Sequence, residues 1–144
     1  LKADERIVLV GLNTKQLGQL PKNIIGLERT ESKEELIALY AHASVFMNLT
    51  YADTYPTTNL ESLSCGTPVI TYNTGGSPEE IRDFNGKVVP QGDYSAAYLA
   101  FSSMRNGFKQ QNTETIRKDA VSRLDKSFQL KKYGELYQSL LIDR

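Results

Sequence analysis

The chain has 144 residues, of which 40% are hydrophobic and 24% charged, and its 17 basic and 17 acidic side chains leave no formal net charge. This is the composition of an ordinary soluble domain, without the basic surface of a nucleic-acid-binding protein or a polybasic membrane anchor. One cysteine and one histidine exclude a disulfide framework and a Cys/His zinc site, and no apolar run is long enough for a transmembrane segment.

The organisation of the chain follows from its length and its first residues. A chain of this size fits one domain in the usual range of about 100–200 residues. The segment Leu1–Glu5 has neither an initiator methionine nor the character of a signal peptide. We therefore expect residues 1–144 to be a single Rossmann-like domain from a longer protein, with a helical tail over 108–144.

Apolar segments of two periods alternate through the first two thirds of the chain. Short, mostly β-branched runs predict buried strands at Ile7–Val10, Ile24–Leu27, Val45–Leu49, Val69–Tyr72 and Lys87–Val89. Capping residues, prolines and helical spacing predict helices within 13–20, from Ser32, around Asn59–Cys65, and from Ser77-Pro78. Strands separated by helices are typical of βαβ units, so the predicted fold class is α/β, a parallel Rossmann-like sheet with helices on both faces.

After Gly92 the pattern is helical only. It predicts a helix over 95–106, a polar link at Gln110–Thr113, and two helices over Thr113–Ser127 and Gln129–Ile142. The last helix carries Tyr133 and Tyr137 at helical spacing, and we interpret these aromatic side chains as part of a core.

Ligands of open parallel sheets bind outside the carboxyl ends of the strands, and the most polar of these loops follows the third predicted strand. Pro56 suits the first turn of a helix, so Thr57 and Thr58 present free N–H groups where a phosphate or sugar hydroxyls can bind. Glu61 shares their helix face and can accept hydrogen bonds from vicinal hydroxyls, as on a ribose. Asp53, just before the helix, can do the same for a sugar.

Each of these features also has a purely structural interpretation. Asp53 alternatively holds its own backbone in an Asx-turn, and Glu61 is alternatively a solvated helix residue. The pair Gly75-Gly76 allows close approach of the backbone to a ligand, with a plain turn as the alternative. Cys65, in an apolar context at the end of a helix, is better explained as a packed, inert thiol than as a nucleophile.

Taken in order, these segments resemble the C-terminal domain of the group 1 glycosyltransferases, the retaining family 4 enzymes with the GT-B fold. The family's consensus motifs are E-G-F-G-L-x-x-x-E, then A-x-G-x-P-V, then G-G-x-x-E. The corresponding segments here are Asp53–Glu61, Leu63–Ile70 and Gly75–Glu79, with further similarity at Gly26–Leu39 and Asn85–Pro90. The resemblance covers roughly residues 6–142, and the joint spacing is far more specific than any single piece.

The resemblance implies roles at matching positions. Glu61 matches the acid that holds the ribose hydroxyls of the nucleotide, and Asp53 matches the acid beside the transferred sugar, so these two are the expected catalytic residues. The donor-binding positions implied by the match are Glu61 itself with Tyr55, Thr57, Thr58, Leu27, Arg29, Gly75 and Gly76. Two departures stand out, because Asp53 is one methylene shorter than Glu and Thr54-Tyr55-Pro56 replaces Gly-Phe-Gly, where Pro56 has no N–H to donate.

The function implied is transfer of a hexose or related sugar from a nucleotide-diphosphate sugar to a glycan or lipid-linked acceptor with retention, as in polysaccharide biosynthesis. This chain would be the donor-binding half, inactive alone, because in the family the acceptor site and a histidine near the reacting centre come from the N-terminal domain. The nucleotide sugar is a substrate, so no cofactor is expected, and without an Asp-x-Asp motif no metal is expected. The expected location is the cytoplasm, with peripheral contact of the whole protein with the inner membrane face left open.

Two alternatives remain at this point. One is another GT-B enzyme, such as a nucleotide-sugar epimerase or a phosphorylase; an epimerase would need no separate acceptor. The other is a non-catalytic nucleotide-binding module that keeps the fold without the chemistry. The departures at Asp53 and Pro56 are the features that favour this second alternative.

Overall fold

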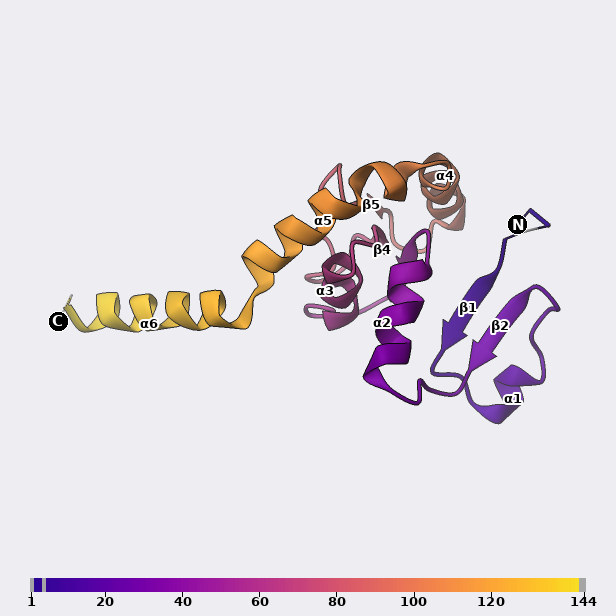
Figure 1. Ribbon diagram of the computed structural model, residues 1–144, viewed down its shortest axis with the longest axis horizontal. Helices are drawn as coiled ribbons and strands as arrows, with labels where there is room; N and C mark the ends of the chain where they lie inside the picture. The colour runs from indigo at the N-terminus through magenta and orange to yellow at the C-terminus, as the bar shows by residue number, and fades with distance from the viewer. Residues whose placement is uncertain (1, 4, 143–144) are drawn as a thin grey trace. The chain divides into compact units, whose positions relative to one another are not determined.

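The computed structural model describes residues 2–3 and 5–142 and divides the chain into two compact units, Leu1–Ala38 and Leu39–Arg144. Each unit contains a parallel sheet, of two strands in the first and three in the second (Figure 1). The predicted α/β class is therefore confirmed. None of the helices within the described ranges combines the length and apolarity needed to cross a membrane.

The first unit is built on two short strands, β1 (Ile7–Val10) and β2 (Ile24–Leu27), which pair in parallel. Helix α1 (Thr14–Leu17) lies between them in the chain and begins at a capping box formed with Asn13. The Thr14 hydroxyl donates a 3.1 Å hydrogen bond to the carboxylate of Glu28, which ties the helix to the segment after β2. These elements match the predicted strands and short helix.

Helix α2 (Lys33–His42) begins in the first unit and ends in the second. The second unit continues with β3 (Phe46–Asn48), α3 (Thr57–Ser64), β4 (Val69–Tyr72) and β5 (Gly86–Val89). The three strands lie in the order β3-β4-β5, and both pairings are parallel. The carboxyl ends of these strands therefore meet at one edge of the sheet, and the loops that follow β3 and β4 leave from that edge.

The central strand β4 is buried on both faces because helices cover each side of the sheet. Val69 packs with residues of α3 and of α5 (Phe108–Leu124), namely Leu63, Ile116 and Ala120. Ile70 and Tyr72 pack instead with residues of β5 and α4 (Tyr94–Met104), namely Val89, Ala97 and Met104. Alternate side chains of a strand point to opposite faces, so this division confirms the prediction of helices on both faces.

The prediction of a helix starting at Ser77-Pro78 is wrong. The segment forms consecutive turns, with hydrogen bonds between groups three residues apart, such as the Ile81 N–H to the Pro78 carbonyl at 3.0 Å. The buried Asn85 side chain accepts from the Arg82 N–H at 2.7 Å and donates to the Glu80 carbonyl at 2.9 Å. In a helix, the Arg82 N–H and the Glu80 carbonyl would bond to other backbone groups. The Asn85 side chain takes both of them instead, which disfavours a helix here.

The predicted polar link at Gln110–Thr113 is also wrong, because α5 runs through it. Asn112 and Thr113 donate side-chain hydrogen bonds of 2.7 Å to the carbonyls of Phe108 and Lys109, one turn back, so both polar side chains are accommodated within the helix. The helix is anchored further on by Ile116 and Ala120, both fully buried.

Helix α6 (Lys126–Ile142) differs from its expected role. Tyr133 and Tyr137 are 58% and 64% exposed, so the interpretation of these residues as core is wrong. The helix extends from α5 away from the three-stranded sheet (Figure 1), and among the described residues of this unit no element covers its apolar face.

Candidate functional site

The loops that follow β3 and β4 meet backbone to backbone at the carboxyl edge of the three-stranded sheet. The Gly76 N–H donates to the Asp53 carbonyl at 3.3 Å. A Cβ atom on Gly75 would lie 1.9 Å from that carbonyl oxygen, and one on Gly76 would lie 2.0 Å from the Thr54 carbonyl oxygen. The close approach that the glycine pair allows is thus made to the neighbouring loop. Contact of these glycines with a ligand stays a prediction.

A hollow of about 530 Å³ opens where the two loops meet, and its lining residues are Ala52, Asp53, Thr54, Thr74 and Gly75. The Asp53 side chain is half-buried, and its Oδ1 accepts the Tyr55 N–H at 3.1 Å. This is the Asx-turn considered from the sequence. The turn holds the carboxylate at the wall of the hollow, so the structural interpretation is confirmed without displacing the carboxylate from the site.

Helix α3 starts where the sequence predicts, with Pro56 in extended conformation as its N-cap. No side chain caps this N-terminus and its first turn holds no acid. The residues of that turn, Thr57 and Thr58, are exposed. An uncapped helix N-terminus carries partial positive charge on its free N–H groups, and such an end binds phosphate, carboxylate or sulfate groups.

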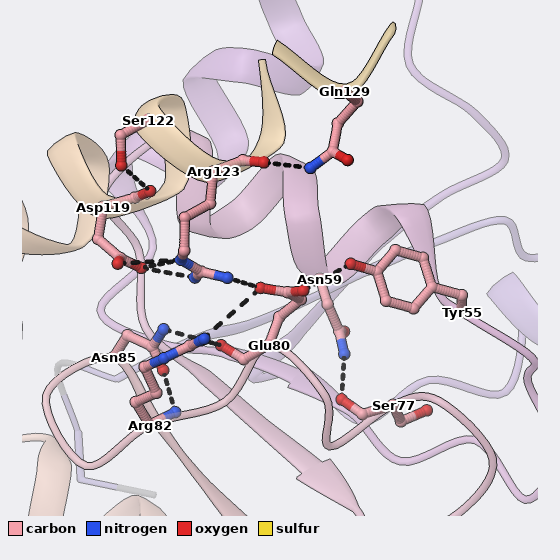
Figure 2. Close-up of polar contacts among 10 residues, drawn as sticks. All are labelled: Tyr55, Asn59, Ser77, Glu80, Arg82, Asn85, Asp119, Ser122, Arg123 and Gln129. Carbon is pink, nitrogen blue, oxygen red and sulfur yellow. Dashed lines mark hydrogen bonds and ion pairs between the residues drawn. The ribbon is translucent and has the colours of Figure 1, made fainter. Parts of the chain in front are cut away.

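Asn59 fixes α3 to the end of β3 and to the loop after β4, and sequence analysis did not identify this role. This buried side chain accepts from the amide of Asn48, the last residue of β3, at 2.9 Å. It donates to the Ser77 carbonyl at 3.3 Å (Figure 2). Asn59 lies three and four residues before Ser62 and Leu63, which are buried as well. That helical spacing is the signal by which an amide on the buried face of α3 can be recognised.

Glu61 lies one turn after Thr57 and is exposed, but it has a partner within the unit. The hydroxyl of Tyr40 donates to its Oε2 at 3.1 Å. Tyr40 is itself 8% exposed and packs edge-to-face on Phe46. Burial and, secondly, the charge of Glu61 raise the pKa of Tyr40, so the phenol stays protonated and remains a donor. Glu61 is therefore a held carboxylate rather than a merely solvated one.

The loop between β3 and α3, which carries Asp53 and Tyr55, is called the Asp53 loop below. A second polar cluster, the Glu80 cluster, contacts this loop at Tyr55 (Figure 2). The Tyr55 hydroxyl donates to Glu80 Oε1 at 2.7 Å, while Glu80 Oε2 pairs with the guanidinium groups of Arg123 and, at 3.6 Å, of Arg82. Arg123 in turn donates from Nε to both carboxylate oxygens of Asp119 at 3.0 Å. Sequence analysis missed this cluster because Glu80 and Arg123 are 43 residues apart and follow no local pattern.

Leu27 and Arg29 belong to the first unit and are described there alone. Leu27 is the last residue of β2, and its carbonyl accepts the Gly11 and Leu12 N–H groups at 3.0 and 3.2 Å. Arg29 is exposed in the segment that follows. Contact of these two residues with a nucleotide base stays a prediction.

Cys65, the C-cap of α3, is half-buried, and this burial raises the pKa of its thiol above the ordinary value of 9.0. Less thiolate is then present at neutral pH, as in the packed, inert thiol that the sequence suggests. Within residues 2–3 and 5–142, no three side chains of His, Cys, Asp or Glu gather in a way that could hold a metal ion.

Comparison with known proteins places these features in a family. Residues 12–112 match the model of the family described as "Glycosyl transferases group 1". The chain belongs to this family. The match includes Asp53, Glu61 and the glycine pair, and it ends before the second half of α5, where Arg123 lies.

This group 1 glycosyltransferase chain is 33% identical over 67 residues to a D-inositol 3-phosphate glycosyltransferase from Streptomyces bingchenggensis (strain BCW-1). The aligned part is 46% of this chain but 15% of the relative. The chain therefore spans a small part of that enzyme's length.

Solved structures of GT-B glycosyltransferases share its fold. They include sucrose-phosphate synthase from Thermosynechococcus elongatus, with a TM-score of 0.79 and 20% identity over 96% of this chain and 39% of that one. HepE from Anabaena in complex with UDP has a TM-score of 0.72 and 18% identity, over 93% of this chain and 41% of that one. The catalytic domain of starch synthase IV from Arabidopsis thaliana, bound to ADP and acarbose, has a TM-score of 0.64 and 16% identity, over 87% of this chain and 28% of that one. Identities this low establish the fold alone.

Proposed function

We propose that the protein carrying this chain transfers a sugar from a nucleotide-diphosphate sugar to an acceptor with retention of configuration, and that this chain is its donor-binding half. The observation that carries the proposal is the juxtaposition around α3. Its uncapped N-terminus follows the Asp53 turn at the wall of a hollow, and Glu61 lies one turn further along the same helix. UDP and ADP in two solved structures of the same fold support a nucleoside diphosphate as the ligand.

The chemistry of the proposal follows from where charge develops. When the bond between sugar and diphosphate breaks, negative charge grows on the leaving phosphate. The N–H groups at Thr57 and Thr58, aligned with the dipole of α3, are suited to stabilise that charge. Asp53, at the wall of the hollow, would accept hydrogen bonds from the transferred sugar.

Glu61 would hold the nucleotide by its ribose. A carboxylate accepts hydrogen bonds only, and its two oxygens match two vicinal hydroxyls. The Tyr40 phenol already donates to Oε2, which orients the carboxylate before the ligand arrives. Leu27 and Arg29 remain the residues that we propose to meet the base. No metal ion or cofactor enters this scheme.

The acceptor belongs to the part of the reaction that this chain does not supply. In this proposal the acceptor is a glycan or a lipid-linked glycan, bound by the N-terminal domain of a GT-B enzyme that works in the cytoplasm. Incubation of the full-length protein with donor alone separates transfer from epimerisation. An epimerase would convert the donor sugar without any acceptor, whereas a transferase would show transfer only when acceptor is added.

Ligand-observed NMR with a panel of nucleoside diphosphates and nucleotide sugars tests the donor site. Full-length wild-type protein is compared with Glu61→Gln and with the matched control Glu114→Gln, an exposed glutamate of α5 paired with Lys118. We expect one nucleotide to bind selectively, about tenfold or more weakly to Glu61→Gln because a charged acceptor is lost, and normally to the control. A full-length protein that binds no member of the panel would refute the proposal.

A further inference from the structure

Tyr55 occupies a position where the family's consensus motif has phenylalanine, and its hydroxyl makes a bond that phenylalanine cannot make. The residue lies between the Asp53 turn and the N-cap of α3. Its N–H donates to the Asp53 carboxylate at 3.1 Å, and its hydroxyl donates to Glu80 at 2.7 Å. The segment between Asp53 and α3 is thus held twice at Tyr55, by its backbone N–H and by its side-chain hydroxyl, and Figure 2 shows the second contact.

Glu80 is suited to hold this phenol because its own carboxylate is held in place by two arginines. The Glu80 side chain is 16% exposed and that of Arg123 is 26% exposed, so their ion pair is only partly screened by water. Asp119 accepts from the same guanidinium, which sets its plane, and Arg82 lies on the other side of Glu80 (Figure 2). One oxygen of Glu80 is thereby held by the arginines, and the other is turned to Tyr55.

The cluster connects two parts of the chain that are remote in sequence. Glu80 follows the glycine pair that presses on the Asp53 loop, whereas Arg123 comes from the last turn of α5, beyond the segment that matches the family. The Asp53 loop is therefore in backbone contact with the glycine pair, and Glu80 connects it to α5 through Arg123.

We propose that Glu80 is a positioning residue for the donor sugar, acting through the Tyr55 hydroxyl to hold the Asp53 loop in its sugar-binding conformation. The proposal rests on the proposed donor site. It assigns Glu80 to the sugar and not to the nucleotide, because the groups proposed to hold the diphosphate and ribose lie on α3 itself. Loss of the contact should then weaken binding of a nucleotide sugar more than binding of the same nucleoside diphosphate.

Calorimetric titration of the full-length protein with UDP-glucose and UDP, and with ADP-glucose and ADP, separates these contributions. The variants are Tyr55→Phe, Glu80→Gln, their double mutant and the control Glu114→Gln. For the pair that binds, we expect each single variant to lose about fivefold in affinity for the nucleotide sugar and less than twofold for the diphosphate, as for one lost hydrogen bond. The double mutant should lose no more than the more affected single variant, because Tyr55→Phe removes the contact that Glu80→Gln weakens by removing the charge of its acceptor. The control should bind as wild type.

A readout that does not depend on binding accompanies the titrations. In tyrosine-labelled protein, the ring signal of Tyr55 should shift in Glu80→Gln and stay unchanged in Glu114→Gln. An unshifted signal would overturn the contact itself.

Other outcomes would overturn the assignment to the sugar. Additive losses in the double mutant would mean that Glu80 does not act through Tyr55. Equal loss for UDP-glucose and UDP would mean a general structural role, and unchanged affinity in Tyr55→Phe, which keeps the ring and its packing, would remove the positioning role. A wild type that binds neither these four probes nor any other member of the nucleotide panel would instead show that the proposed function has failed.

Discussion

The hydroxyl of Tyr40 donates a hydrogen bond of 3.1 Å to Oε2 of Glu61, joining the end of α2 to the helix that carries the candidate ribose ligand. The Tyr40 carbonyl in turn accepts a 2.5 Å hydrogen bond from the Thr67 hydroxyl, just before β4. Lys109 of α5 donates to the carbonyls of Ala41 and Ala43 at the same helix end. The orientation of one exposed carboxylate is therefore set by a buried phenol, and Thr67 and Lys109 fix the helix end that carries this phenol.

Tyr40→Phe removes this bond and should lower the free energy of unfolding by about 1–2 kcal/mol at pH 7, since a part-buried hydrogen bond to a carboxylate is lost. The pKa of Tyr40 in the folded protein is raised above the 10.0 of an ordinary tyrosine. The stabilisation is therefore full below pH 10 and is lost as pH rises above it, where the unfolded chain ionises first. Urea unfolding of wild type and variant at pH 7 and above pH 10 measures both effects.

Tyr98→Phe is the matched control for this measurement. Tyr98 is 58% exposed on α4, and its replacement should change the free energy of unfolding by less than about 0.5 kcal/mol at pH 7. A Tyr40→Phe variant as stable as Tyr98→Phe, or a gap from wild type that widens above pH 10, would contradict the role assigned to the Tyr40–Glu61 bond.

The strands were predictable because each is a short apolar run bounded by turn residues. Val69–Tyr72 lies between Pro68 and Asn73, and its run of apolar side chains with one threonine fits a strand buried on both faces. The prediction of a helix after Ser77 was wrong for a reason that the local sequence pattern does not show. The capping signal was present, but the Asn85 side chain takes the backbone groups that the helix needs.

The candidate site divides in the same way. Pro56 predicted the start of α3, and the Asx-turn was the structural alternative for Asp53, because both depend on chemistry within a few residues. The partner of Glu80 could not be predicted, because nothing near Arg123 in the sequence indicates that α5 returns to the Asp53 loop. Likewise, the exposed tyrosines of α6 have the spacing of a core face, and only the fold shows that the described part of this unit leaves them uncovered.

Cys65 should react slowly with alkylating reagents. Burial raises the pKa of its thiol above 9.0, so at pH 8 the folded protein holds less thiolate than an unfolded chain does. We expect iodoacetamide to modify the folded chain several-fold more slowly than the same chain in urea, and the folded rate to rise as pH passes 9. Because the chain has one cysteine, intact mass spectrometry follows a single site. Equal rates in the two states at pH 8 would show that the thiol is not shielded.

Gly75→Ala tests whether the two loops need direct backbone contact. The added Cβ would lie 1.9 Å from the Asp53 carbonyl oxygen, and the φ angle of +50° disfavours any other residue, so the loops must separate. We expect a loss of at least about 2 kcal/mol in the free energy of unfolding, measured in urea, because steric clash adds to backbone strain. Gly134→Ala is the matched control, since a Cβ there meets no atom within 4 Å in the described part of α6, and alanine favours a helix by about 1 kcal/mol. If Gly75→Ala proves as stable as wild type, the loops are not held together by this contact, and the position of Asp53 must be set by its own turn alone.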